Sequence, residues 1–286
     1  MNIFIAVDME GATGVTHHDQ LMPDGKTYSA ACKLLTGDVN AVIEGILATE
    51  PQCSVIVGDG HGIMRNVILE QLHPMAELVV GPAAPQNKPL CQLEGISASA
   101  DMLFMVGYHS RAGYPNGLLA HTYVGSLIRN FRLNRAAVGE ITVNAAIAAS
   151  FGATVGLVSG NSDLAEEAEN ILGENGEFVC VKSTLGPTAA ICKTPAKTAD
   201  LLREAAIRAV VKFKEGKLKS VEPAKVTIME VETYRRESVD RALTATGLYR
   251  TGECSFETSD KNAAEAFRRI WSGIARALDE PAAWLR

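Results

Sequence analysis

Residues 2–11 read NIFIAVDMEG, and this stretch decides the class of fold. Its apolar part, residues 2–7, is typical of a parallel strand that is covered on both faces. The run stops at Asp8, and Gly11 permits a sharp exit. Asp8 and Glu10 are two residues apart, so an extended chain would point both carboxylates the same way. The stretch predicts a buried strand that ends in a pair of acids.

Short apolar runs alternate with helical patterns along the chain that follows. We expect further strands at 53–57, 102–106 and 153–158, a turn at 134–135 flanked by 127–133 and 137–138, and helices at 27–49, 140–150 and 163–172. Ser162 has the character of an N-cap for the last of these helices. This alternation predicts an α/β fold with a mainly parallel sheet flanked by helices.

The pattern changes in the last third of the chain. We expect a helix from Pro195 to about residue 215, capped by Thr194, then strands at 225–231 and 254–256 and a final helix at 261–278. These elements predict a smaller C-terminal α+β portion. We therefore divide the chain into a catalytic α/β domain, 1–189, and an α+β domain, 190–286.

Composition excludes several classes of protein. The 286 residues are 47% hydrophobic and 21% charged, which is typical of a globular chain rather than a disordered one. The formal net charge of -6 argues against a nucleic-acid partner, which needs a clustered basic surface. No run approaches the roughly 20 apolar residues of a membrane span, and the first apolar run is too short for a signal peptide. Six scattered cysteines without a CxxC pair favour reduced thiols, so we expect a cytoplasmic protein.

Three successive predicted strands run into residues that bind metals. The first ends at Asp8 and Glu10, the second is followed by Asp59-Gly60-His61, and the third by Tyr108-His109. Ligands of open α/β sheets bind beyond the carboxyl ends of the strands, so these side chains are expected to meet. Imidazoles mixed with carboxylates suit zinc, manganese or cobalt better than calcium or magnesium. More than two acids suggests two ions bridged by one carboxylate.

Five blocks of sequence together resemble the motifs of the DppA-type D-aminopeptidases, zinc enzymes of the bacterial dipeptide-transport family. The blocks are Asp8-Met9-Glu10-Gly11, Asp59-Gly60-His61, Gly107-Tyr108-His109-Ser110-Arg111-Ala112, Ala120-His121-Thr122, and Val138-Gly139-Glu140 with Asn144. Their order and rough spacing agree over about residues 1–150. The sequence departs from the pattern at Gly58, where asparagine is common, and at Gly60, where serine or alanine is more usual.

The resemblance implies a role for each matching residue. It implies two zinc ions per chain, with Mn²⁺ or Co²⁺ as possible replacements, held by Asp8, Glu10, His61, His109 and Glu140, with Asp8 as the bridge. It implies His121 as the catalytic residue, a short peptide as the substrate, and a ring-shaped homodecamer that encloses its active sites.

Each residue also has a simpler interpretation. Asp8 and Glu10 would suit a helix N-cap, and Glu140 would suit the first turn of its helix, where the dipole favours an acid. His109 and His121 would suit buried core positions. Asp59 is expected to orient a ligand histidine rather than to bind metal. The sequence does not assign roles to His17 and His18.

The sequence therefore predicts a dinuclear zinc aminopeptidase for short peptides or amides with an N-terminal D-amino acid. Another two-metal hydrolase, an amidohydrolase or a phosphoesterase, would use the same ligands. A peptide-binding protein of a transport system without turnover is the alternative outside the enzymes.

Overall fold

A seven-stranded sheet forms the centre of the protein. The computed structural model describes residues 1–82 and 84–278. The strands lie in the order β3-β2-β1-β4-β7-β8-β9, and all pairs are parallel except β8 with β9. Their bounds are Asn2–Val7 (β1), Ser54–Asp59 (β2), Ala76–Val79 (β3), Met102–Tyr108 (β4), Thr154–Asn161 (β7), Glu177–Gly186 (β8) and Ala189–Cys192 (β9). The order reverses between β1 and β4, which is where α/β sheets bind their ligands.

Helices cover both faces of this sheet, and the side chains of β1 show why. Ile3, Ile5 and Val7 face a core made with α1 (Tyr28–Thr49) and α4 (Pro195–Lys214). The alternate residues, Phe4 and Ala6, face a second core that includes α2 (Glu140–Ala149) and α3 (Ala165–Leu172). A strand buried on both faces needs apolar residues at every position, and this explains the unbroken apolar run at the N-terminus.

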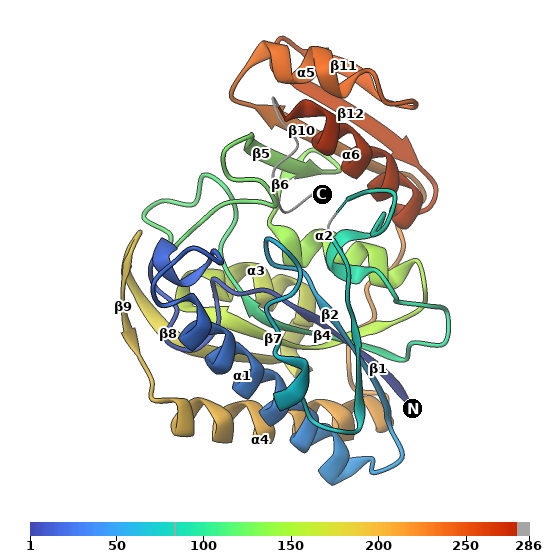
Figure 1. The fold of residues 1–286 in the computed structure, drawn as a ribbon. Coiled ribbons are helices and arrows are strands. Elements are labelled where there is room, and N and C mark those ends of the chain that lie inside the picture. The colour runs from blue at the N-terminus through green and yellow to red at the C-terminus, as the bar shows by residue number, and fades with distance from the viewer. Residues whose placement is uncertain (83, 279–286) are drawn as a thin grey trace.

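A smaller antiparallel sheet lies above the large one (Figure 1). Its order is β11-β12-β10-β5-β6. The strands are Tyr249–Gly252 (β11), Ser255–Asp260 (β12), Thr227–Thr233 (β10), Ile128–Leu133 (β5) and Ala136–Ala137 (β6). Helices α5 (Arg236–Ala242) and α6 (Ala263–Ala277) pack with it. Strands β5 and β6 of this sheet precede residue 190, whereas α4, which follows residue 190, packs on the large sheet. The division of the chain near residue 190 stays a prediction.

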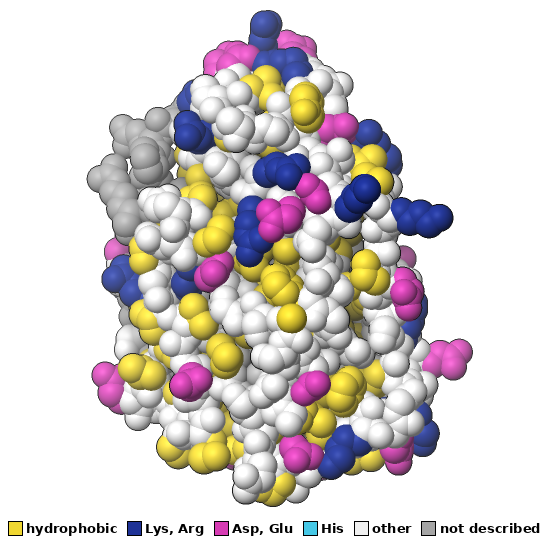
Figure 2. Space-filling view, turned by 90° about the vertical axis from the view of Figure 1, so that its right-hand side faces the viewer, with side chains coloured by type: hydrophobic (Ala, Val, Ile, Leu, Met, Phe, Trp, Pro, Cys, Tyr) yellow, Lys and Arg dark blue, Asp and Glu magenta, His cyan; other side chains and the backbone are white. Residues whose placement is uncertain are grey.

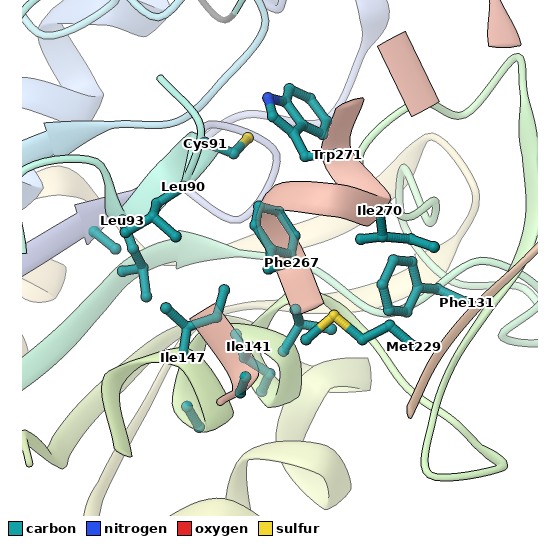
Figure 3. Packing of buried hydrophobic residues seen from close by; sticks show 14 of the residues in the cluster. Leu90, Cys91, Leu93, Phe131, Ile141, Ile147, Met229, Phe267, Ile270 and Trp271 are labelled. Atoms are coloured by element: carbon teal, nitrogen blue, oxygen red, sulfur yellow. The ribbon is translucent and has the colours of Figure 1, made fainter. Parts of the chain in front are cut away.

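One apolar core joins the two sheets. Phe267 and Trp271 of α6 belong to the same buried cluster as Phe131 of β5 and Ile141 of α2. Figure 3 shows Trp271 near Cys91, and Phe267 between Phe131 on one side and Leu90 and Leu93 on the other; Leu90 is the N-cap of the short turn η3 (Cys91–Leu93). The cluster therefore fixes the small sheet and η3 against the same side of the large sheet.

The expected α/β class with a mainly parallel sheet is confirmed, and the differences are local. The sequence patterns missed β3, β8, β9, α5 and β11. Ser162 is not the N-cap of α3: it begins a 3₁₀ turn, Ser162–Leu164, and its hydroxyl accepts a hydrogen bond from Thr184 N instead. Thr194 does cap α4, because its side chain accepts from Lys197 N.

Charged side chains of both signs are mixed on the surface. In Figure 2, Lys and Arg side chains lie next to Asp and Glu, and no broad basic patch is seen on that face. Within residues 1–82 and 84–278, no helix combines the length and apolar character that crossing a membrane requires.

Candidate metal centre and active site

The ends of three central strands bring the predicted residues together. Strands β2 and β4 pair on either side of β1, so Asp8, His61 and His109 follow neighbouring strands. Backbone hydrogen bonds continue past the strands, from Asp8 N to Val106 O and from Gly11 N to Gly107 O. A Cβ atom at position 11 would lie 1.7 Å from the Tyr108 carbonyl oxygen, so only glycine lets the loop pass so close to β4.

The carboxylate of Asp8 lies at the middle of the cluster. Its Oδ1 is 3.3 Å from His61 Nδ1, and its Oδ2 is 3.3 Å from His109 Nε2. Glu10 Oε2 lies 3.0 Å from the same His61 nitrogen, and Glu140 Oε1 lies 3.7 Å from the same His109 nitrogen. The two oxygens of Asp8 therefore face two different pairs of side chains. Asp8 and Glu10 cap no helix, because the first helical turn after them begins only at His18.

Both imidazoles are fixed by backbone carbonyls through the nitrogen that points away from the acids. His61 Nε2 lies 2.8 Å from Leu21 O, and His109 Nδ1 lies 2.9 Å from Ser110 O. A carbonyl only accepts, so these nitrogens carry the proton in the neutral ring. The opposite nitrogens then direct lone pairs toward the carboxylates, which is the tautomer a metal ligand requires.

Glu140 is the first residue of α2, yet its side chain turns into the cluster. Its Oε1 accepts a hydrogen bond from Tyr123 N at 2.6 Å, and its Oε2 accepts one from Gln92 Nε2. The residue is 4% exposed. Burial, followed by the charge of Asp8, raises the pKa of Glu140 to about 8. An acid whose only benefit was the helix dipole would stay in solvent, so the dipole alone does not account for this position.

His121 stacks on His109 at the side of the cluster that faces the cavity. The two ring centroids are 4.3 Å apart and the planes differ by 16°. His121 Nδ1 lies 3.0 Å from Leu119 O, and Nε2 lies 3.8 Å from Glu10 Oε1. Burial and the charge of His109 lower the pKa of His121 below its ordinary value. The ring is only partly covered, unlike the core histidine of the simpler interpretation.

The charges of the cluster are strongly coupled. Burial acts against the charged form of Asp8, but hydrogen bonds and charges from His109 and His61 outweigh it and hold the pKa of Asp8 well below its usual range. Burial likewise acts against protonated His109, but the hydrogen bond to Asp8 and the surrounding acids raise the pKa of His109 to about 10. The cations that balance these acids in the metal-free protein are the two imidazoles themselves.

The other polar residues that the sequence analysis considered lie outside the cluster. Asp59 was expected to orient a ligand histidine, but its carboxylate does not contact the His61 ring. It accepts hydrogen bonds from Asn66 N, Asn66 Nδ2 and Val67 N, and so it shapes the loop after β2. His17 is exposed and is the N-cap of the 3₁₀ turn His18–Gln20. His18 lines the mouth of the cavity beside the cluster.

Two buried charged residues fix the loop that follows β1. Sequence patterns did not single out either of them. Lys182 of β8 is fully buried, and its ammonium donates to the carbonyl oxygens of Glu10 (2.9 Å) and Ala12. Asp38 of α1 accepts from the amide and the hydroxyl of Thr13, both at 2.8 Å. A lone lysine after the apolar residues of β8 is the one sequence signal that could have indicated this contact. The loop that carries Glu10 is thus fixed from two elements far away in sequence.

A cavity of about 540 Å³ opens beside the cluster. Its polar wall contains Asp8, Glu10, His61, His121 and Glu140, and its apolar wall includes Leu21, Met22, Met64, Val124 and Trp271. A cleft with a few convergent polar groups in an apolar wall is the usual form of a small-molecule site.

The donor set suits metal ions. Two groups of buried side chains, Asp8 with Glu10 and His61, and Asp8 with His109 and Glu140, each hold their ligand atoms within 4.8 Å of one another. A third such group contains Glu10, His109 and His121. With both rings in the neutral tautomer, Glu10 Oε2 and His109 Nε2 are buried without a hydrogen-bond partner, although buried polar atoms normally have one. An ion at each of the first two groups would satisfy both atoms.

Carboxylates and imidazoles gathered at the switch point of a parallel sheet are typical of metallohydrolases. Residues 1–272 match the family model of the D-aminopeptidases, peptidase family M55. A D-aminopeptidase of Bacillus subtilis (strain 168) is 30% identical over 273 residues, which are 94% of this chain and 95% of that protein. The chain belongs to the peptidase M55 family of D-aminopeptidases, and the resemblance seen in the five motifs is confirmed.

A solved structure agrees across nearly the whole fold. The Zn-dependent D-aminopeptidase DppA from Bacillus subtilis, a self-compartmentalizing protease, has a TM-score of 0.89 and 27% identity to this chain. The match covers 98% of this chain and 99% of that one. It therefore includes the last third, for which the sequence motifs offered no counterpart.

Proposed function

We propose that this chain is a dinuclear zinc aminopeptidase that hydrolyses short peptides or amides with an N-terminal D-amino acid. The observation that carries the proposal is the position of Asp8, whose two oxygens face two separate groups of ligands. One ion would be held by Asp8, Glu10 and His61, and the other by Asp8, His109 and Glu140. Zinc is supported by the ligand types and by the zinc-dependent relative. The D-configuration rests on the family.

His121 and Glu10 would have different roles in hydrolysis. When bound, a pair of zinc ions supplies Lewis acidity for a carbonyl and lowers the pKa of water. His121 Nδ1 is held by Leu119 O, so its Nε2 presents a lone pair toward the cavity. That nitrogen would take a proton from the attacking water and return it to the leaving amine. Glu10, which lies beside His121, is an acidic partner for the amino group of the substrate.

Substrate hydrolysis separates this proposal from its rivals. Zinc-loaded protein is incubated with D-alanine amide, L-alanine amide and a phosphate monoester, and the products are quantified. We expect cleavage of the D-amide that stops when a chelator removes the metal and returns when zinc is restored. Cleavage of the phosphate ester alone would indicate a phosphoesterase, and binding of peptides without turnover would indicate a transport protein.

We also propose that the chain forms a closed homo-oligomer, and the family resemblance specifies a decamer. The self-compartmentalizing relative supports this. The β8–β9 hairpin exposes Leu185 and Ile191, at 66% and 64%, and apolar side chains on an edge strand favour an interface between copies. Light scattering coupled to size exclusion should give about ten times the chain mass of 30.5 kDa. An active monomer would contradict the enclosed arrangement.

A further inference from the structure

We infer that Gln92 is a positioning residue for Glu140, and that it selectively supports one of the two metal ions. The inference rests on the proposed function, because it concerns the ligands of that site. Gln92 lies on η3, outside all five sequence motifs, and is 2% exposed. Its Nε2 donates to Glu140 Oε2.

The direction of the Gln92 amide is set by its neighbours. Its Oε1 accepts from Asn144 Nδ2 at 2.6 Å and from the Tyr108 hydroxyl at 3.2 Å. The same Asn144 nitrogen donates to the Tyr108 oxygen at 3.1 Å. Since the oxygen end of the amide faces these two donors, its NH₂ end must face Glu140.

This network leaves Glu140 one orientation. With Oε2 accepting from Gln92 and Oε1 accepting from Tyr123 N, the carboxylate cannot rotate without breaking a buried hydrogen bond. Oε1 is also the oxygen that lies 3.7 Å from His109 Nε2. Gln92 therefore directs Oε1 toward the ion shared by Asp8, His109 and Glu140.

The turn that carries Gln92 is itself rigidly placed. Leu90 and Leu93 are buried beside Ile147 of α2 (Figure 3), the helix that begins with Glu140. A Cβ atom at position 60 would lie 2.5 Å from Gln92 Cγ, and one at position 58 would lie 2.8 Å from Gln92 O. The glycines at these two departures from the family pattern therefore make room for Gln92.

Gln92 makes no such contact with the other group of ligands. No hydrogen bond joins it to Asp8, Glu10 or His61 among the described residues. A residue that only stabilised the fold would affect both ions alike when it was changed. A residue that positions Glu140 would affect one.

Zinc affinity measured by chelator competition tests the inference on the full-length protein. Gln92→Met keeps the length of the side chain and removes its donor and acceptor. We expect a loss of 10–100-fold in the affinity for one ion, the range typical of groups that orient metal ligands, with the other ion unchanged. With Co²⁺ in place of zinc, the visible absorption of one of the two ions should change.

Two further variants keep the test decisive. Tyr108→Phe removes one of the two bonds that orient the Gln92 amide and preserves shape, so we expect a smaller loss for the same ion. The matched control is Thr36→Val, which removes two hydrogen bonds, to Cys32 O and from Ile68 N, neither of which involves a metal ligand. It should leave both ions unchanged, while circular dichroism checks the fold of each variant.

The outcomes separate the inference from the proposed function. Equal affinities in wild type and Gln92→Met, or equal losses for both ions, would overturn the role of Gln92 while the dinuclear site stands. A wild-type protein that takes up no ion would overturn the proposed function and this inference together.

Discussion

The two sheets carry the same kinds of charged side chain under opposite conditions. At the carboxyl edge of the large sheet, Asp8, Glu10 and Glu140 are almost fully buried, and no lysine or arginine of the described chain forms an ion pair with them. On the small sheet, Arg132 pairs with Glu230 at 2.9 Å and with Glu232 at 2.7 Å. Figure 2 shows acidic and basic side chains side by side in this upper part of the molecule.

This difference distinguishes a functional site from a surface that carries ordinary ion pairs. Charge in the small sheet is balanced by neighbouring charge and by water, so each pair adds little to stability. Charge in the large sheet is removed from water and balanced only by imidazoles, which is costly unless an ion completes the cluster. Burial of acids without a lysine or arginine partner, rather than the number of acids, identifies the functional edge.

The largest expected effect comes from Asp8→Ala, because Asp8 belongs to both ligand groups. We expect both ions to be lost and turnover to fall by at least about 10³-fold, equivalent to several kcal/mol of lost metal catalysis. Elemental analysis and amide hydrolysis measure the two effects. The matched control is Glu230→Ala on the small sheet, which should keep both ions. An Asp8→Ala protein with full metal content would remove Asp8 from the centre of the site.

His121→Ala should leave both ions in place and reduce turnover by about 10²–10⁴-fold, the usual value of general acid–base help. Substrate binding should change much less than turnover. Steady-state kinetics together with metal analysis give the answer. Loss of one ion would instead make His121 a ligand, as its place in the third group with Glu10 and His109 allows.

The metal-free fold should lose stability as pH rises. The pKa of His109 is raised to about 10 in the metal-free fold, so its protonated form stabilises that fold below about pH 6.5, and this stabilisation is lost as pH rises toward 10. Glu140, whose pKa is raised from 4.5 to about 8, acts in the same direction, and its contribution is lost as pH rises from about 4.5 to 8. The gain in melting temperature on adding zinc should therefore grow from pH 6.5 to 9. A gain that shrinks with rising pH would contradict this charge balance.

The smallest effect is expected for Arg132→Ala. It removes two ion pairs of the small sheet, and the free energy of unfolding should fall by about 1 kcal/mol or less. Metal content and turnover should stay unchanged, as denaturant unfolding and zinc analysis would show. A loss of zinc would mean that the two sheets are coupled more tightly than their charges indicate.

The sequence predicted the elements whose hydrophobic residues form a long, regular pattern. The apolar run of β1 and the long helices α1 and α4 were found within a few residues. Strand β3 is short and half-exposed, and β9 lies at the edge of the sheet with mostly exposed residues, so neither has a buried periodic face to detect. Helix α5 has only seven residues, too few for two full turns of pattern.

The site was predictable where its residues follow strands, and hidden where they do not. Four of the six candidate residues, Asp8, Glu10, His61 and His109, were found because the ends of parallel strands meet, and the family motifs added Glu140 and His121. Gln92 and Lys182 could not be predicted in the same way, because each acts through a contact between segments far apart in the sequence. Their only local signal is a polar side chain among apolar neighbours.

The most direct test of the central claim is the anomalous scattering of zinc in a crystal of the metal-loaded protein. The dinuclear site predicts two peaks per chain, about 3.5–4 Å apart, with the Asp8 carboxylate between them. Glu10 and His61 should lie at one peak, and His109 and Glu140 at the other. A single peak, or peaks away from the carboxyl ends of β1, β2 and β4, would contradict it.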